Sequence, residues 1–230
     1  MAPTWLTTVG WFYLGVCFAC SAALTYDIFI DRRRQPMGVM DAVYPITALY
    51  FGPFALALYW RWARSPSPAG HEPGHALGPA KPRWVTMAIE VSHCGAGCAL
   101  GDLIAEWLIF ALALTVAERT LFAEYLGDYA LALALGIVFQ YFAIAPMQGL
   151  GVKDGLVAAA KADFIALSCF ELGLFGWMAL MAFVFFPAPH HLPPTSAAYW
   201  FLMQIGMIIG FFTSWPANVW LVKRGIKVPM

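Results

Sequence analysis

The sequence predicts an all-α fold, a polytopic bundle of transmembrane helices, on three observations. Apolar residues make up 61% of the 230 residues and charged residues only 11%, whereas soluble domains average about 45–50% and about 25%. The mean hydropathy is +0.70. Apolar stretches of about 20 residues or more, enough to cross a bilayer core, recur along the whole chain. This composition excludes an ordinary soluble enzyme, a disordered chain and a small disulfide scaffold, and the zero net charge argues against a nucleic-acid partner.

About six spans are expected within one integral membrane domain over residues 1–230. The apolar stretches are Trp5–Ile30, Val39–Trp60, Val85–Ala117, Tyr129–Leu150, Ala162–Phe186 and Ala198–Val222. Residues 64–83 are rich in proline and are expected to form a flexible cytoplasmic loop within this domain. Pro45 and the Gly52-Pro53 pair can break a helix, so the second stretch either crosses the membrane or is re-entrant.

The distribution of Lys and Arg gives the expected orientation, because cytoplasmic loops carry an excess of these residues. With six spans and the N-terminus inside, the inner segments hold nine of them and the outer loops four. We therefore expect both termini to be cytoplasmic. The outer set includes the run Arg32–Arg34, which violates the rule unless the second stretch is re-entrant.

Several acids fall inside the apolar stretches, whereas the Lys and Arg residues lie in loops or at span ends. Carboxyl groups in hydrocarbon are costly and often mark an ion or proton pathway. We predict a cation path or proton relay from four of them: Asp102, Glu106, Asp163 and Glu171. Three others have a simpler structural interpretation, as interfacial, protonated or helix-bonding groups: Asp27, Asp41 and Glu90.

The third stretch holds a cluster of sulfur and imidazole. Residues four apart on a helix share a face, so Glu90, Cys94, Cys98, Asp102 and Glu106 are expected to form one ladder. Thiolate and imidazole favour soft metals, and we predict a metal site made by His93, Cys94 and Cys98, for Cu(I) first and Zn(II) second. Gly97 and Gly101, also four apart, would allow a second helix to approach closely.

Two methionines four apart in the last stretch, Met203 and Met207, are possible thioether ligands in the same metal site. Both the methionines and the cysteines are also common as ordinary buried apolar residues, so this structural interpretation stays open.

These features favour a membrane protein that binds and translocates a soft metal ion. A second hypothesis is an integral-membrane thiol oxidoreductase linked to a quinone or a partner disulfide, using Cys94 and Cys98 or the C-x-x-C pair Cys17 and Cys20. A third is an accessory subunit of a larger membrane complex, or a homo-oligomer, whose polar groups join helices. Whether the protein is an enzyme stays open. No nucleotide-binding Walker motif is present in the sequence, which argues against ATP-driven transport by this chain alone.

The run from His93 to Trp107, HCGAGCALGDLIAEW, resembles the signature of a bacterial membrane family, domain of unknown function 4396. Further segments are similar to that family: Tyr44–Tyr50, Ala162-Asp163 with Phe170–Gly173, Tyr199–Gln204, and Asn218 with Lys223–Lys227. The resemblance covers most of the chain from about Asp31 onward. It implies a compact multi-pass protein of the bacterial inner membrane and nothing about its chemistry.

Overall fold

The computed structural model describes residues 2–65 and 81–227, except for the side chains of residues 145–148. Most of the predicted loop over residues 64–83 lies outside these residues. The described chain is helical throughout, apart from turns and one isolated backbone bridge, which confirms the predicted fold class. The helices are α1 (Thr4–Thr25), α2 (Met40–Phe51), α3 (Pro53–Leu58), α4 (Arg83–Leu112), α5 (Thr120–Gln148), α6 (Val152–Leu180) and α7 (Ala197–Lys223). Short π-helical segments extend α1, α3 and α6: η1 (Tyr26–Ile30), η2 (Tyr59–Ala63) and η3 (Met181–Phe185).

Five of the described helical segments are long and apolar enough to cross a membrane. They are Thr4–Ile30, Arg83–Leu112, Thr120–Ile144, Val152–Phe185 and Ala197–Lys223. Large apolar side chains lie exposed on them, among them Phe12 and Leu172, each 74% exposed. Such a surface suits contact with lipid tails rather than with water.

The second apolar stretch forms a helical hairpin, α2 followed by α3. The 12 residues of α2 span only roughly 18 Å. Gly52 ends this helix at a φ of +53°, a conformation that favours glycine, and Pro53 then begins α3. At this turn the hydroxyl of Tyr13 donates to the carbonyl of Tyr50 (3.1 Å). Since Tyr13 lies half-way along α1, the hairpin turns back in the middle of the bundle. This geometry fits the re-entrant alternative better than a full crossing.

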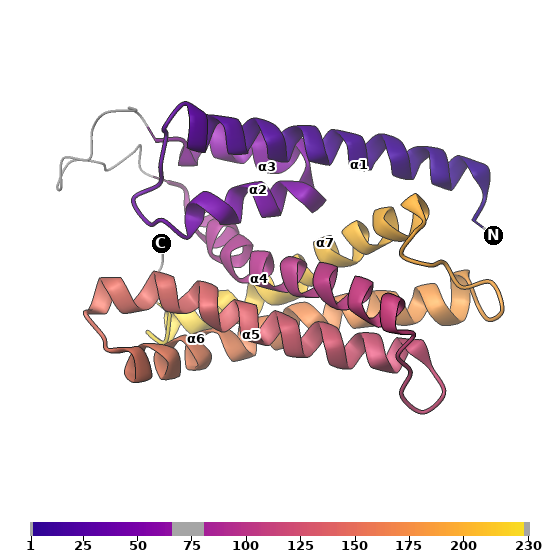
Figure 1. Cartoon of the computed structure of the whole chain (residues 1–230). Coiled ribbons are helices and arrows are strands. Elements are labelled where there is room, and N and C mark those ends of the chain that lie inside the picture. Colours follow the sequence, from indigo (N-terminus) through magenta and orange to yellow (C-terminus); the bar gives the residue numbers. More distant parts are fainter. Residues whose placement is uncertain (1, 66–80, 228–230) are drawn as a thin grey trace.

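The two ends of the described chain lie at opposite ends of the bundle (Figure 1). α1 begins beside the start of α7, where a Cβ on Gly10 would come within 2.7 Å of the Ala197 carbonyl oxygen. Two cytoplasmic termini need an even number of crossings, whereas five of the described segments are long and apolar enough to span a membrane. The orientation of the termini stays a prediction, and this arrangement does not favour it.

Because the hairpin turns back, the run Arg32–Arg34 lies at the end of the bundle where α4 begins and α7 ends. There Arg33 donates to the carbonyl of Ser65 (2.8 Å). We call this the basic end, because every Lys and Arg except Arg119 lies in this half of the bundle (Figure 1). The opposite end, with the α4–α5 and η3–α7 loops, is called the cavity end below.

α4 is the central helix and packs against α2, α5, α6 and α7. Its glycines allow the close approach that the sequence predicts. A Cβ on Gly97 would lie 2.8 Å from the Cα of Gly136, and one on Gly101 would lie 2.6 Å from the Cα of Ala132. The α4–α5 contact therefore depends on small residues, as in many membrane helix pairs.

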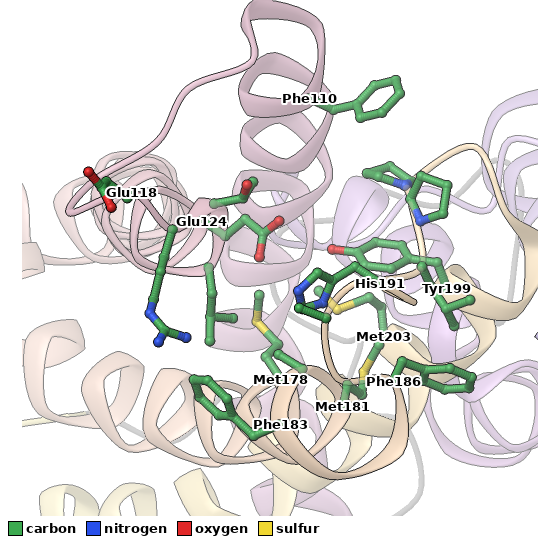
Figure 2. Close-up of a pocket in the computed structure, with 18 of the residues that line it drawn as sticks. Phe110, Glu118, Glu124, Met178, Met181, Phe183, Phe186, His191, Tyr199 and Met203 are labelled. Atoms are coloured by element: carbon green, nitrogen blue, oxygen red, sulfur yellow. The ribbon is translucent and has the colours of Figure 1, made fainter. Parts of the chain in front are cut away.

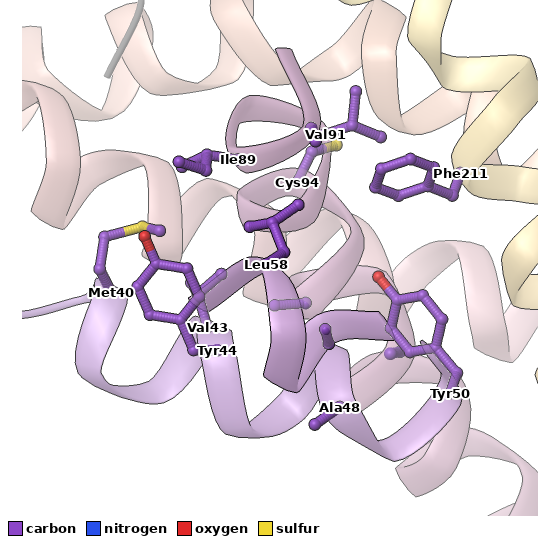
Figure 3. Packing of buried hydrophobic residues seen from close by; sticks show 14 of the residues in the cluster. Met40, Val43, Tyr44, Ala48, Tyr50, Leu58, Ile89, Val91, Cys94 and Phe211 are labelled. Carbon is purple, nitrogen blue, oxygen red and sulfur yellow. The ribbon is translucent and has the colours of Figure 1, made fainter. Parts of the chain in front are cut away.

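The main apolar core lies between the hairpin, α4 and α7 (Figure 3). Phe51 packs edge-on against Phe211 with ring centroids 4.8 Å apart, and Tyr44 packs similarly against Tyr59 at 5.1 Å. Cys94 of α4 reaches into this core (Figure 3). The hairpin thus covers one side of the central helix.

Candidate functional site

The predicted ladder on α4 is present and buried. α4 is unbroken from Arg83 to Leu112, so its i, i+4 residues do share a face. Its members are each 1% exposed or less: Glu90, Cys94, Cys98, Asp102 and Glu106. The Cys94 and Cys98 side chains lie close to each other. The ladder therefore places carboxyl and thiol groups along most of the length of the bundle interior.

Two predicted acids of α6 join this ladder from the side. The Asp163 carboxyl lies close to the Cys94 thiol, and the Glu171 carboxyl lies close to the Cys98 thiol. Space for Asp163 exists because the facing residue of α5 is Gly136, on which a Cβ would overlap the carboxyl. Each thiol thus has its own carboxyl neighbour on the adjacent helix.

Two further acids come from α5, and the sequence reasoning missed both. Asp128 is fully buried, faces Glu106 and lies within electrostatic range of Asp102. Glu124, one turn earlier, lies within range of Glu106. The predicted span began only at Tyr129, whereas α5 begins at Thr120. The i, i+4 spacing of these two acids was the available signal.

We call this set the acid line; it consists of Cys94, Cys98, Asp102, Glu106, Glu124, Asp128, Asp163 and Glu171. In five of its members neither carboxyl oxygen has a hydrogen-bond partner among the described residues: Asp102, Glu106, Asp128, Asp163 and Glu171. Buried carboxyl groups without partners are costly, and membrane proteins retain them chiefly along pathways and at sites. The acid line is therefore the strongest candidate for function.

The acid line opens into a cavity of about 750 Å³ at the cavity end (Figure 2). Glu124 and Tyr199 line this cavity, and the Tyr199 side chain also faces Glu106. Three methionine side chains contribute sulfur to its wall: Met178, Met181 and Met203. His191, from the η3–α7 loop, lies beside them in Figure 2. The cavity thus combines thioether, imidazole and carboxyl groups.

The predicted metal ligands are distributed rather than gathered. His93 is buried against α5, where its ring centroid lies 6.3 Å from that of Phe139 and its side chain lies close to Gln140. Met203 lines the cavity, whereas Met207 packs in the main apolar core. In residues 2–65 and 81–227, no three His, Cys, Asp or Glu side chains are placed to hold a metal ion together.

The acids near the basic end have partners. Asp27 binds the guanidinium of Arg64 (Nη2–Oδ1, 2.5 Å) and accepts a hydrogen bond from the Tyr59 hydroxyl (2.9 Å). Asp41 binds Arg34 (3.0 Å). Glu90 pairs with Lys227, Nζ to Oε2 at 3.7 Å. These contacts agree with the structural interpretation favoured for Asp27, Asp41 and Glu90.

A family model described as domain of unknown function (DUF4396) matches residues 83–227. The chain belongs to this family. The family region comprises α4 to α7, so the whole acid line lies inside it, whereas α1 and the hairpin precede it. The resemblance is confirmed there, and its Tyr44–Tyr50 segment lies outside the matched residues. No curated protein and no solved structure matches the chain.

Proposed function

We propose that this protein carries a cation across the membrane along the acid line. The observation that supports the proposal is a series of buried, unpartnered carboxyl groups that runs from near the basic end to the cavity. The carboxyl and thiol groups of this line favour positive charge. Carboxyl groups that bind or release protons as an ion passes would also make it a proton relay.

A soft ion suits the donors better than a hard one, and Cu(I) is the first choice, with Zn(II) second. Thiol and thioether groups select Cu(I), and both types occur, Cys94 and Cys98 in the line and Met203 in the cavity wall. His93 and Met207 then have secondary roles as neighbours of the path.

The charge distribution supports an orientation. Because cytoplasmic segments carry the excess of Lys and Arg, the basic end with the C-terminal part of α7 would face the cytoplasm of a bacterial cell. The cavity and the start of α1 would face the outside of the inner membrane. The cavity would then be the external mouth of the path.

The thiol oxidoreductase hypothesis has less support. All five cysteines are free thiols, but such chemistry needs a thiol that a partner can reach. The two candidate pairs, Cys17 with Cys20 and Cys94 with Cys98, are buried, and Cys169 is partly buried.

The test is copper content and Cu(I) uptake of the full chain in proteoliposomes under reducing conditions. The variant Cys94→Ser/Cys98→Ser should lose bound copper and uptake, whereas the matched control Cys17→Ser/Cys20→Ser should keep both. Thiols lose their protons when they bind metal, so wild-type copper binding should weaken as the pH falls. Equal copper content and uptake in the two double variants would refute the soft-metal proposal.

A further inference from the structure

The last described turn of the chain returns a lysine to the bundle interior. Gly225 adopts a φ of +68°, the left-handed conformation that commonly ends helices, and the N–H of Ile226 donates to the carbonyl of Leu221 (3.1 Å). The chain thereby folds back beneath α7. As a result Lys227, which the sequence places in a cytoplasmic segment, is only 1% exposed.

The ammonium group of Lys227 is bound by oxygen atoms of α4 and α7. Its Nζ donates to the Asn218 side-chain oxygen (2.9 Å) and lies 3.7 Å from a carboxyl oxygen of Glu90. Asn218 is oriented for this contact, because its own amide donates to the Ser214 hydroxyl (2.9 Å). An ammonium is a compact point charge, so these oxygens form a site for a small cation.

The same ammonium lies at the basic end of the acid line. It is within electrostatic range of Asp163 and of the Cys94 thiol. Asp163 is fully buried, and neither of its oxygens has a hydrogen-bond partner among the described residues. The Asp163 carboxyl thus lies close to the first thiol of the line and within electrostatic range of the bound ammonium.

We infer that Glu90 and Asn218 form a binding site for a small monovalent cation beside Asp163, and that the Lys227 ammonium is a tethered occupant which the permeating cation displaces. The inference rests on the proposed function, since it assigns the basic-end mouth of the same path. Displacement conserves the charge of the site, because one positive charge leaves as another enters. Lys227 therefore closes the path until a cation arrives.

The test measures how fast Cys94 reacts with a small cationic thiol reagent, 2-aminoethyl methanethiosulfonate, in the full-length reconstituted protein. Peptide mass spectrometry reports the modified cysteine, so the other thiols stay in place. Lys227→Met should raise the Cys94 rate about tenfold, the effect of removing one nearby like charge from a low-dielectric site. Lys227→Arg should keep the wild-type rate, and so should Lys223→Met, which removes an exposed lysine of the same end.

The uncharged reagent methyl methanethiosulfonate separates a charge effect from simple opening. An equal rise with both reagents, or no rise with either, would refute the tethered-cation inference. If Lys227→Met does not fold, Lys227→Gln replaces it, because glutamine removes the charge and keeps a donor for Asn218.

Cu(I) uptake by the same proteoliposomes tells the two proposals apart. If the wild type takes up Cu(I) and Lys227→Met takes up no more, Lys227 does not close the path, and the proposed function is unaffected. No uptake by any variant refutes the proposed function, and the Cys94 rates still decide whether Lys227 fills a cation site.

Discussion

The basic end and the acid line bury the same chemical group in opposite ways. At the basic end, Asp27 and Asp41 are each bound by an arginine. Along the line, carboxyl groups such as Asp102 and Asp128 are more deeply buried and have no hydrogen-bond partner among the described residues. A carboxyl needed only for stability gains from a partner, because an unpartnered buried charge is costly. The difference is what we expect if the first group stabilises the fold and the second serves the proposed cation path.

Glu90 lies at the boundary between these two regions. It belongs to the α4 ladder, but it pairs with a lysine as the basic-end acids do. Its partner Lys227 distinguishes Glu90 from the rest of the ladder, and this lysine lies on the turn after α7 rather than within a helix. The Glu90–Lys227 pair is therefore the place where entry of a cation into the proposed path would be controlled.

The largest effect on the fold is expected where the line depends on close helix packing. Gly101→Ala would place a Cβ 2.6 Å from the Cα of Ala132, and overpacking of this kind costs about 1–3 kcal/mol. It should also lower Cu(I) uptake, since separation of α4 from α5 moves Asp102 away from Asp128. Thermal unfolding in detergent and proteoliposome uptake measure the two effects.

Gly176→Ala is the matched control for this change, because no heavy atom lies within 4 Å of a Cβ at Gly176. If the two alanine variants were equally stable and equally active, the line would not depend on the α4–α5 contact.

A smaller effect is expected at the edge of the basic end. Asp41→Asn weakens the contacts with Arg34 and with the backbone N–H of Gln35. The Arg34 side chain is 47% exposed, and ion pairs with such exposure contribute roughly 0.2–1 kcal/mol. Unfolding should shift slightly and uptake should match the wild type. A strong loss of uptake in Asp41→Asn would show that the acids of the basic end also serve transport, which contradicts the difference between the two regions.

Much of the fold could be predicted from the sequence, because hydropathy and span length follow from local composition. The helical bundle, the central glycines Gly97 and Gly101, and the helix break at Gly52 were all readable in this way. The number of long spans could not be predicted in this way, because the helices beside an interrupted apolar stretch decide whether it crosses the bundle or turns back. The run Arg32–Arg34 was the available sign that this stretch turns back, because the hairpin places these arginines at the same end as most other Lys and Arg residues.

The members of the candidate site were predictable where acids fall inside apolar stretches, as for Asp163 and Glu171, but their arrangement was predictable only within one helix. The ladder from Glu90 to Glu106 follows from helical periodicity, which the unbroken α4 preserves. Asp128 and Lys227 were missed because they approach the ladder from distant parts of the chain, one on α5 and one on a reversing turn. The predicted joint role of His93 with the cysteines has no test in the described contacts, which place its ring against α5.

The most direct test of the central claim compares Asp102→Asn with Asp27→Asn for both uptake and stability. Asp102→Asn should keep wild-type stability and lower Cu(I) uptake by about tenfold or more, which corresponds to ~1.4 kcal/mol or more. Asp27→Asn should retain uptake and lose about 1–3 kcal/mol of unfolding free energy, because Arg64 and Tyr59 lose a charged partner. Equal uptake in the two variants, or loss of stability in Asp102→Asn alone, would contradict the account.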